Sequence, residues 1–271
     1  MHFSRLFGIA IIAVQLLFWL TYSLLWKRLV TRVSAMDFTL WESFRQQNLL
    51  NLGKYLPGKI WGMIARGATL TGNGMTVAGA VIATITEQTL VLHSAFLVSA
   101  ILFASLQPSS STAALAIASI LTLAFGAQLL RIALRLYLRM TKPTEEKMGA
   151  QKIKLISSAT YLKFALGHRA GWIVNGLLFA SIYHASFDAA PSIQLLGILI
   201  LANTVGVTLG FLAIFAPGGI GVREAATSGV LTLAMPLDDA IMLAVLFRLW
   251  LLLTDIIVGG LVVVGNRKKS L

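Results

Sequence analysis

The sequence predicts an all-α protein: a polytopic integral membrane helical bundle with two re-entrant Pro-Gly hairpins and inverted-repeat-like halves. Three observations lead to this fold class. The chain is 57% hydrophobic and only 12% charged, and a soluble domain of 271 residues cannot bury that much apolar surface. Several apolar runs approach the roughly 20 residues that cross a bilayer. Two Pro-Gly breaks occur in similar local sequences, "KYLPGKIWG" and "FAPGGIGVREA".

Six apolar runs are predicted to cross the membrane. In chain order they are Phe7–Trp26, Val77–Ser105, Thr112–Leu130, Gly171–His184, Ile193–Phe215 and Ile241–Gly265. The first run could be a signal peptide, but it lacks a small-residue cleavage site and is followed by cations. We therefore expect it to remain as a helix.

The charges of the loops predict how these spans are oriented. The net charge is +12, and most cations fall in three segments: Lys27–Arg45, Arg131–Lys154 and Arg267–Lys269. The alternating segments have no Lys or Arg: Gln107–Ser111, Ala185–Ser192 and Pro236–Asp239. Because basic loops stay in the cytoplasm, we expect these three segments, and with them the C-terminus, to be cytoplasmic. The charge then reflects topology, and no nucleic-acid partner is expected.

One membrane domain is expected over residues 1–271, in two halves. The parts are residues 1–140 with a hairpin at 43–70, a basic cytoplasmic linker at 141–154, and residues 155–271 with a hairpin at 193–234. The pieces 43–56 and 58–70 are each about 21 Å long as helices, too short for a hydrocarbon core of about 30 Å. Ile193–Phe215 is long enough to span alone, so re-entry is less well specified there.

The two hairpins share a short internal similarity. The matched positions lie 160 residues apart: Tyr55 and Phe215, Pro57 and Pro217, Gly58 and Gly218, Ile60 and Ile220. The loop charges make the two hairpins enter from opposite faces of the membrane. Inverted repeats with broken helices that meet near the midplane are an arrangement found in transporters.

The first hairpin carries polar and cationic residues around its break. The candidate substrate-binding residues are Asn48, Asn51, Lys54, Tyr55, Lys59 and Arg66. A helix that begins at Gly58 would direct its first amides at an anion, so this set resembles a receptor for phosphate or carboxylate. The alternative is that Lys54, Lys59 and Arg66 extend to the inner surface and contact lipid headgroups.

The second hairpin has a glycine-lined turn with Pro217, Gly218, Gly219 and Gly221, followed by Arg223 and Glu224. Arg223 and Glu224 are the substrate-binding candidates here. No strand precedes the turn, which argues against a nucleotide-binding loop. The alternative is a structural hairpin in which the two charged residues form a pair or a helix cap.

Three charged residues lie inside predicted spans: Glu87, Arg248 and Asp255. A charge at this depth is costly unless it is paired. Glu87 and Arg248 lie 161 residues apart, close to the hairpin offset. We expect them to pair with each other, or each with a hairpin cation. Their role would be static pairing or gating.

No metal site and no cofactor are expected. The chain has no cysteine, and its four histidines lack ligand spacing. No acid-base pair for catalysis is visible, so we do not expect an enzyme.

The segments "YLPGKIWGMIAR" followed by Glu87, and "PGGIGVREA" followed by Arg248, resemble the lysylphosphatidylglycerol synthase transmembrane family. This is the flippase-like membrane domain of multiple peptide resistance factors, also found as stand-alone proteins. The resemblance runs from about Trp26 to the C-terminus and implies a helical fold with re-entrant hairpins. It also implies a multi-pass protein of the plasma (inner) membrane of a bacterium or archaeon. Gln88 stands where the family often has Arg. No aminoacyl-transfer domain is expected in this sequence, so lipid aminoacylation is not expected.

The resemblance assigns the family's motif to these positions: Tyr55, Pro57, Gly58, Arg66, Glu87, Pro217, Gly218, Gly219, Gly221, Arg223, Glu224 and Arg248. The expected function is a flippase or transporter for an anionic lipid, either an anionic phospholipid or a polyprenyl phosphate. The alternative is a non-transporting membrane partner or scaffold of a lipid-modifying or glycan-assembly enzyme. An enzyme acting on polyprenyl-linked substrates is the least favoured reading.

Overall fold

The computed structural model describes residues 5–56, 58, 60–141 and 153–267, and this part of the chain is all-α, with no strand. In chain order the elements are α1 (Arg5–Ser34), α2 (Leu40–Gly53), α3 (Trp61–Gly72), α4 (Val77–Leu106), α5 (Ser110–Thr141), α7 (Ser158–Phe187), α8 (Ile193–Leu212), the short helix η1 (Pro217–Gly219), α9 (Val222–Leu231) and α10 (Leu237–Arg267). The prediction of an all-α membrane protein is confirmed for this part of the chain. Pro57, Lys59 and most of the predicted linker (142–152) lie outside the described residues.

The multi-pass character of the chain follows from its longest apolar helices. α4, α8 and the Leu237–Val262 part of α10 are long and apolar enough to cross a bilayer. A fourth span is added if the two pieces of α5, which meet at 52°, count as one. α1 and α7 are each 30 residues long but are not among these helices. Both carry buried polar side chains, including Gln15 and His168, which lower their apolarity.

One boundary differs from the sequence prediction. The basic residues Arg131, Arg135 and Arg139 were expected in a loop, but α5 continues through them to Thr141. Arg131 bonds back to the helix and across to α7, through Ala127 O at 3.2 Å and Ser158 Oγ at 2.9 Å. These bonds favour helix over loop at this end.

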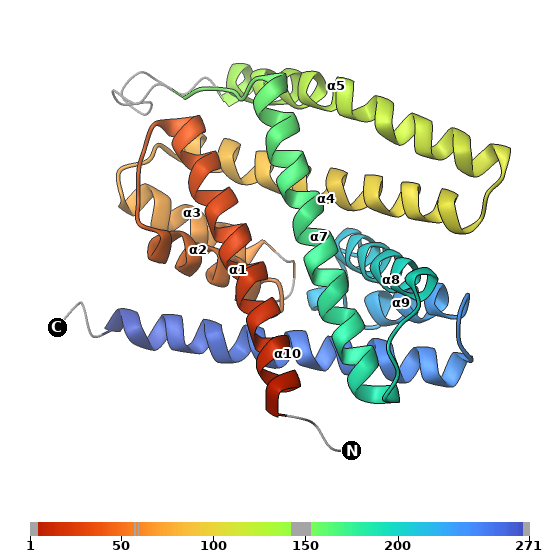
Figure 1. Cartoon of the computed structure of the whole chain (residues 1–271). Coiled ribbons are helices and arrows are strands. Elements are labelled where there is room, and N and C mark those ends of the chain that lie inside the picture. Colours follow the sequence, from red (N-terminus) through yellow and green to blue (C-terminus); the bar gives the residue numbers. More distant parts are fainter. Residues whose placement is uncertain (1–4, 57, 59, 142–152, 268–271) are drawn as a thin grey trace.

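Two helical hairpins face each other across the molecule (Figure 1). One is α2 with α3, and the other is α8 with η1 and α9; the turn of each points toward the other. The loops after α1 and α3, the start of α7 and the end of α10 lie at one end of the molecule. The loops after α4, α7 and α9 lie at the other end. The loops predicted as basic and as cation-free are therefore grouped at opposite ends.

The helices of the first hairpin pack unusually closely because of two glycines. A Cβ atom at Gly53 would overlap the backbone of Gly62, and a Cβ at Gly62 would overlap the backbone of Leu50. In the second hairpin, Gly218, Gly219 and Gly221 have φ of 60°, 75° and 81°. Side-chain-bearing residues rarely adopt these angles, so the glycine-rich turn is required by its geometry.

The buried apolar residues form two clusters. The first includes Trp26, Leu70, Leu90 and Tyr161 and lies between α1, α3, α4, α5 and α7. The second lies between α1, α7, α8, α9 and α10, where the rings of Phe179 and Phe247 stack with centroids 4.1 Å apart. Helices α1 and α7 contribute to both clusters and so join the two halves.

Candidate functional site

The turns of the two hairpins are in direct contact. The backbone N–H of Gly218 donates to the carbonyl of Lys54 at 2.7 Å. A Cβ atom at residue 218 would lie 2.8 Å from Cδ1 of Tyr55, so only glycine allows this approach. The two turns that the internal similarity matches therefore meet inside the bundle.

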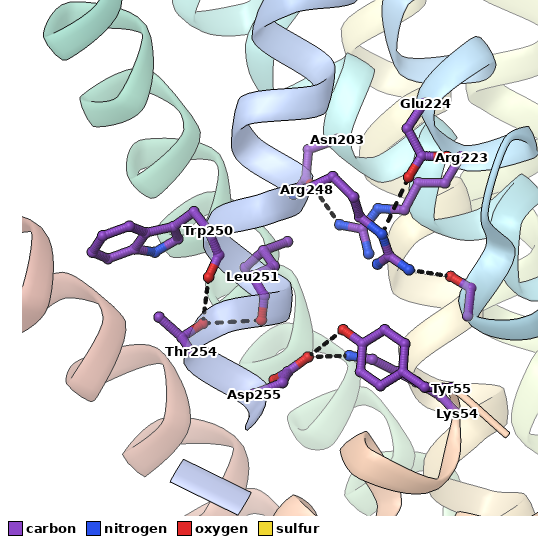
Figure 2. A network of polar contacts seen from close by, with 11 residues as sticks. Lys54, Tyr55, Asn203, Arg223, Glu224, Arg248, Trp250, Leu251, Thr254 and Asp255 are labelled. Carbon is purple, nitrogen blue, oxygen red and sulfur yellow. Dashed lines mark hydrogen bonds and ion pairs between the residues drawn. The ribbon is translucent and has the colours of Figure 1, made fainter. Parts of the chain in front are cut away.

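Helix α10 holds the first hairpin through Asp255, as Figure 2 shows. The carboxylate of Asp255 accepts from Lys54 Nζ at 2.7 Å and from the Tyr55 hydroxyl at 2.8 Å. Asp255 is buried, whereas about a third of the Lys54 side chain (34%) is exposed. These bonds tie the first turn to a helix from the other half of the chain.

The same helix holds the second hairpin through Arg248, seven residues earlier (Figure 2). Arg248 Nε lies 3.2 Å from Glu224 Oε1, and Arg248 Nη2 donates to Gly218 O at 2.6 Å. Its guanidinium also lies 5.4 Å from the centre of the Tyr55 ring. Because Arg248 and Asp255 share one face of α10, this helix fixes both turns.

Glu224 has two structural contacts. It pairs with Arg248, and its Oε2 accepts from the backbone N–H of Gly221 at 2.6 Å. A carboxylate at this position satisfies a free amide at the start of α9 and complements the helix dipole. The helix cap named in the alternative is therefore present, but the ion-pair partner of Glu224 is Arg248 and not Arg223.

Glu87 on α4 forms a buried ion pair with Arg66 on α3. Arg66 Nη1 lies 2.5 Å from Glu87 Oε2, and the two side chains are 0% and 2% exposed. Gln47 Nε2 donates to Glu87 Oε1 at 2.5 Å, and the Arg66 guanidinium lies over the Trp26 ring at 3.8 Å. The buried charge is therefore balanced within the first half.

The predicted pairing of Glu87 with Arg248 is wrong, because each of them is neutralised by the hairpin of its own half. The alternative of a hairpin cation holds for Glu87, whose partner is Arg66. It is wrong for Arg248, whose partner is the hairpin carboxylate Glu224. Each half thus has an ion pair between its hairpin and a long helix, with the two charges exchanged.

A cavity of about 200 Å³ lies where the two hairpins meet. Its polar and charged lining comes from both halves: Tyr22, Gln47, Asn51, Lys54, Glu87, Gln88 and Arg223. Arg223 reaches Asn203 Oδ1 at 3.5 Å, and within the described chain no carboxylate forms an ion pair with it. Among the described residues of this lining, Glu87 is the one carboxylate.

The charges around the turns do not cancel. Among the described residues the cations are Lys54, Arg223 and Arg248, against the carboxylates Glu224 and Asp255. Because the Arg66–Glu87 pair is neutral as a unit, the cluster keeps an excess of one positive charge. A buried excess charge is costly unless an anion compensates for it.

Only some of the predicted site residues line the cavity. Asn51, Lys54, Glu87, Gly218 and Arg223 line the cavity. Asn48 bonds to Phe44 O within α2 at 2.8 Å, and Arg66 lies behind Glu87. The described α3 begins at Trp61 and not at Gly58, so the predicted helix start is displaced by one turn.

Sequence reasoning missed Gln47 and Tyr22, which line the cavity. Gln47 could have been found, because it lies four residues before Asn51 and therefore on the same helical face. The set of candidate residues predicted on this helix began one residue late, at Asn48. Tyr22 carries no such signal, since it lies in an apolar helix of another segment.

The described residues contain no group of three or more His, Asp or Glu side chains that could hold a metal ion. Comparison with known proteins gives one family: a sequence model described as "Lysylphosphatidylglycerol synthase TM region" matches residues 2–259. No curated protein and no solved structure matches the chain. The matched range contains both hairpins, Glu87, Arg248 and Asp255.

Proposed function

Because the chain belongs to the lysylphosphatidylglycerol synthase TM region family, whose members share a membrane domain, we propose that it is a flippase-like lipid transporter. Its cargo is an anionic lipid, with the phosphate carried either by a phospholipid or by a polyprenyl chain. The protein acts in the plasma (inner) membrane of a bacterium or archaeon, with its C-terminus in the cytoplasm.

The observation that carries this proposal is the uncompensated positive charge beside the cavity. Arg223 lines the cavity and has no carboxylate partner among the described residues, and Lys54 lines it from the opposite hairpin. A guanidinium binds phosphate oxygens with two parallel hydrogen bonds, which an ammonium can supplement as a point charge. A phosphate bound between Arg223 and Lys54 would be held by both halves at once.

The arrangement of the hairpins supports alternating access. Their turns face each other in Figure 1, and the loops at their open ends lie at opposite ends of the molecule. The hairpins enter from opposite leaflets, and a shift of one hairpin against the other opens the cavity to one side. Interrupted helices that meet at a central site are used in this way by transporters.

The test is lipid translocation in proteoliposomes with Arg223→Gln. Translocation of phosphatidylglycerol and of a polyprenyl phosphate is measured separately, which identifies the source of the phosphate. Loss of a charged hydrogen-bonding partner should slow transport of the true cargo about tenfold or more. Lys163→Gln, which removes an exposed cation of α7, is the matched control.

Two outcomes would contradict transport. Unchanged rates in Arg223→Gln would remove the proposed phosphate site. Saturable lipid binding that depends on Arg223, without translocation by the wild-type protein, would favour the alternative of a membrane partner or scaffold for a lipid- or glycan-modifying enzyme.

A further inference from the structure

A second cavity, of about 370 Å³, is lined by residues of α4, α5, α8 and α9. Its lining combines buried residues, such as Ala100 and Leu201, with residues at the surface of the bundle, such as Phe96, Leu209 and Leu233. The cavity is therefore a groove that opens on the outside of the bundle. We propose that this apolar groove holds a hydrocarbon tail of the lipid whose phosphate occupies the first cavity. This inference rests on the proposed function and adds the position of the tail.

The chemistry of the lining fits a hydrocarbon chain. Among the described residues of the groove none is charged, and the polar side chains are the hydroxyls of Ser99 and Thr208. Ser99 donates to Thr204 Oγ1 at 2.7 Å, and the Oγ1 atom of Thr208 is buried. Apolar cavities do not hold ordered water, because a water molecule needs several polar partners. The occupant that this lining accommodates is therefore an apolar chain.

The apolar groove and the charged cavity are formed by the same helices, since α4, α8 and α9 line both. On α4, Val91 lines the charged cavity and Phe96 lines the groove, about 7.5 Å further along the helix. On α9 the corresponding residues are Arg223 and Val230, about 10.5 Å apart. One layer of lipid tails is about 15 Å deep, half of a hydrocarbon core of about 30 Å. A tail that starts from a phosphate beside Arg223 is thus long enough to enter the groove.

The groove lies to one side of the charged cavity along the bundle. From the charged cavity toward the groove, α4 runs to its end at Leu106, α9 runs to its end at Leu231, and α8 runs back to its start at Ile193. These three helix ends lie at the end of the molecule that carries the loops after α4, α7 and α9 (Figure 1). The loop charges predict that this end is external.

This placement gives the bound lipid a direction. With its phosphate in the charged cavity and its tail in the groove, the lipid has its headgroup on the cytoplasmic side of its tail. A lipid of the inner leaflet has the same orientation, whereas a lipid of the outer leaflet has the opposite one. The arrangement of the two cavities therefore fits a lipid that has entered from the inner leaflet and has not yet turned over.

The groove should orient the lipid more than it raises the affinity. A tail that moves from the bilayer into the groove exchanges one apolar environment for another, so no hydrophobic driving force accompanies the transfer. What the groove supplies is a fixed position for the chain. The measurement that tests it must therefore report where the tail lies.

The experiment is photo-crosslinking of the full-length wild-type protein in phosphatidylcholine vesicles. Two probes carry a diazirine within a hydrocarbon chain: phosphatidylglycerol with a labelled acyl chain, and farnesyl phosphate with a labelled isoprenoid chain. The labelled peptides are identified by mass spectrometry. Labelling should concentrate on residues 96–103 and 230–233, and unlabelled probe should compete for it. The probe that labels the groove saturably shows whether the tail is acyl or isoprenoid.

A third probe separates the tail of the cargo from ordinary bilayer lipid. Diacylglycerol with the same labelled acyl chain has no phosphate, and it should label the groove weakly and without saturation. Arg223→Gln should lower groove labelling by the phosphate-bearing probe about tenfold, because a charged hydrogen-bonding partner of the phosphate is lost. Lys163→Gln should leave it unchanged. Equal labelling by diacylglycerol would show that bulk lipid fills the groove, and would overturn the inference.

A variant that fills the groove gives an independent test. Ala100→Phe introduces a ring among the buried lining residues and should suppress labelling of residues 230–233. The matched control is Ala113→Phe, an exposed position on α5 that lies almost opposite Leu115 around the helix. Unchanged labelling of residues 230–233 in Ala100→Phe would overturn the inference. If Ala100→Phe does not fold, the comparison of the three probes on the wild-type protein still decides.

Failure of this inference and failure of the proposed function give different results. Labelling outside the groove, together with translocation that still depends on Arg223, would overturn the tail site alone. Absence of both translocation and saturable labelling with either phosphate-bearing probe would overturn both.

Discussion

The two hairpins have a common design and opposite charges. In the first, the hairpin carries the cation Arg66 and the long helix α4 carries its partner Glu87. In the second, the hairpin carries the carboxylate Glu224 and the long helix α10 carries Arg248. The first pair is 0% and 2% exposed, and the second is 9% and 21% exposed. Both halves therefore keep an ion pair between the hairpin and a long helix, while the charges and the exposure of the pair differ.

The difference suggests a division of roles. The second pair is next to its own turn, where Glu224 caps α9 and Arg248 bonds Gly218 O. The first pair is remote from its turn and lies beside the cavity. The second pair should therefore hold the turn in shape, while the first joins α3 to α4 at the wall of the cavity.

The largest effect is expected when the first pair is broken. Arg66→Leu leaves Glu87 buried without its cation and should reduce the stability of the folded protein by about 3–5 kcal/mol. The measurement is unfolding of the protein in detergent. Arg248→Leu should reduce the stability by less, about 1–3 kcal/mol, because its partner Glu224 keeps contact with water and with the Gly221 amide. A larger loss in Arg248→Leu would refute the comparison. Adding Glu87→Leu to Arg66→Leu should recover most of the loss.

A smaller effect is expected when the contact between the turns is disturbed. Gly218→Ala forces a side chain into a residue with φ of 60° and places a Cβ atom 2.8 Å from Tyr55. The expected cost is about 2–3 kcal/mol, with slower translocation. Gly58→Ala is the matched variant in the other turn: its φ is 85°, but nothing lies within 4 Å of the added Cβ. Its cost should be limited to about 1 kcal/mol of backbone strain. Equal losses would show that the contact between the turns is unimportant.

Asp255→Asn should weaken the hold of α10 on the first turn by about 1 kcal/mol, since Lys54 is partly exposed and its pairing is weakened by solvent. Unfolding in detergent and cleavage of the turn by a protease both report on this contact. Asp238→Asn removes an exposed carboxylate from the same helix and should behave as the wild type. Protease cleavage unchanged in Asp255→Asn would mean that Gly218 alone holds the turn.

The smallest effect is expected at the entrance to the first hairpin, where Asp37 pairs with Lys27 at 3.0 Å. A hydrogen bond and the charge of Lys27 hold the pKa of Asp37 below its ordinary value. The pair therefore favours the folded state at neutral pH, and this contribution is lost as the pH falls through the lowered pKa. Because the Asp37 carboxylate is fully exposed, Asp37→Asn should give an acid-unfolding curve that overlays the wild-type curve.

The sequence predicted the helices and turns because these depend on local properties. Apolar run length located α4, α8 and α10, and Pro-Gly sequences located both turns. Buried charges were expected to be paired, and all three are. Their partners were only partly predicted, since the contact of Asp255 with Lys54 and Tyr55 spans 200 residues and depends on how α10 packs.

The Gln47 error has a different origin. Neighbouring residues on a helix point about 100° apart, so Asn48 lies off the face of α2 that Gln47 and Asn51 present to the cavity. The spacing to Asn51 and Lys54 would have corrected this. No local pattern would have shown that Tyr22, from a helix of another segment, completes the wall.

The backbone hydrogen bonds of Gly218 should also affect how long the two hairpins stay together. Its amide proton bonds Lys54 O and its carbonyl oxygen accepts from Arg248, so one residue fastens two hairpins and a long helix. Separation of the two hairpins in the proposed transport cycle would break the bond from the Gly218 N–H to Lys54 O, in a setting where free backbone groups are poorly solvated. The time that the hairpins stay joined should therefore depend on how quickly water or the proposed phosphate cargo can replace this bond. Without water or a ligand at this point, the bond between the hairpins should persist. Binding of a hydrated lipid headgroup would then itself promote separation of the two hairpins.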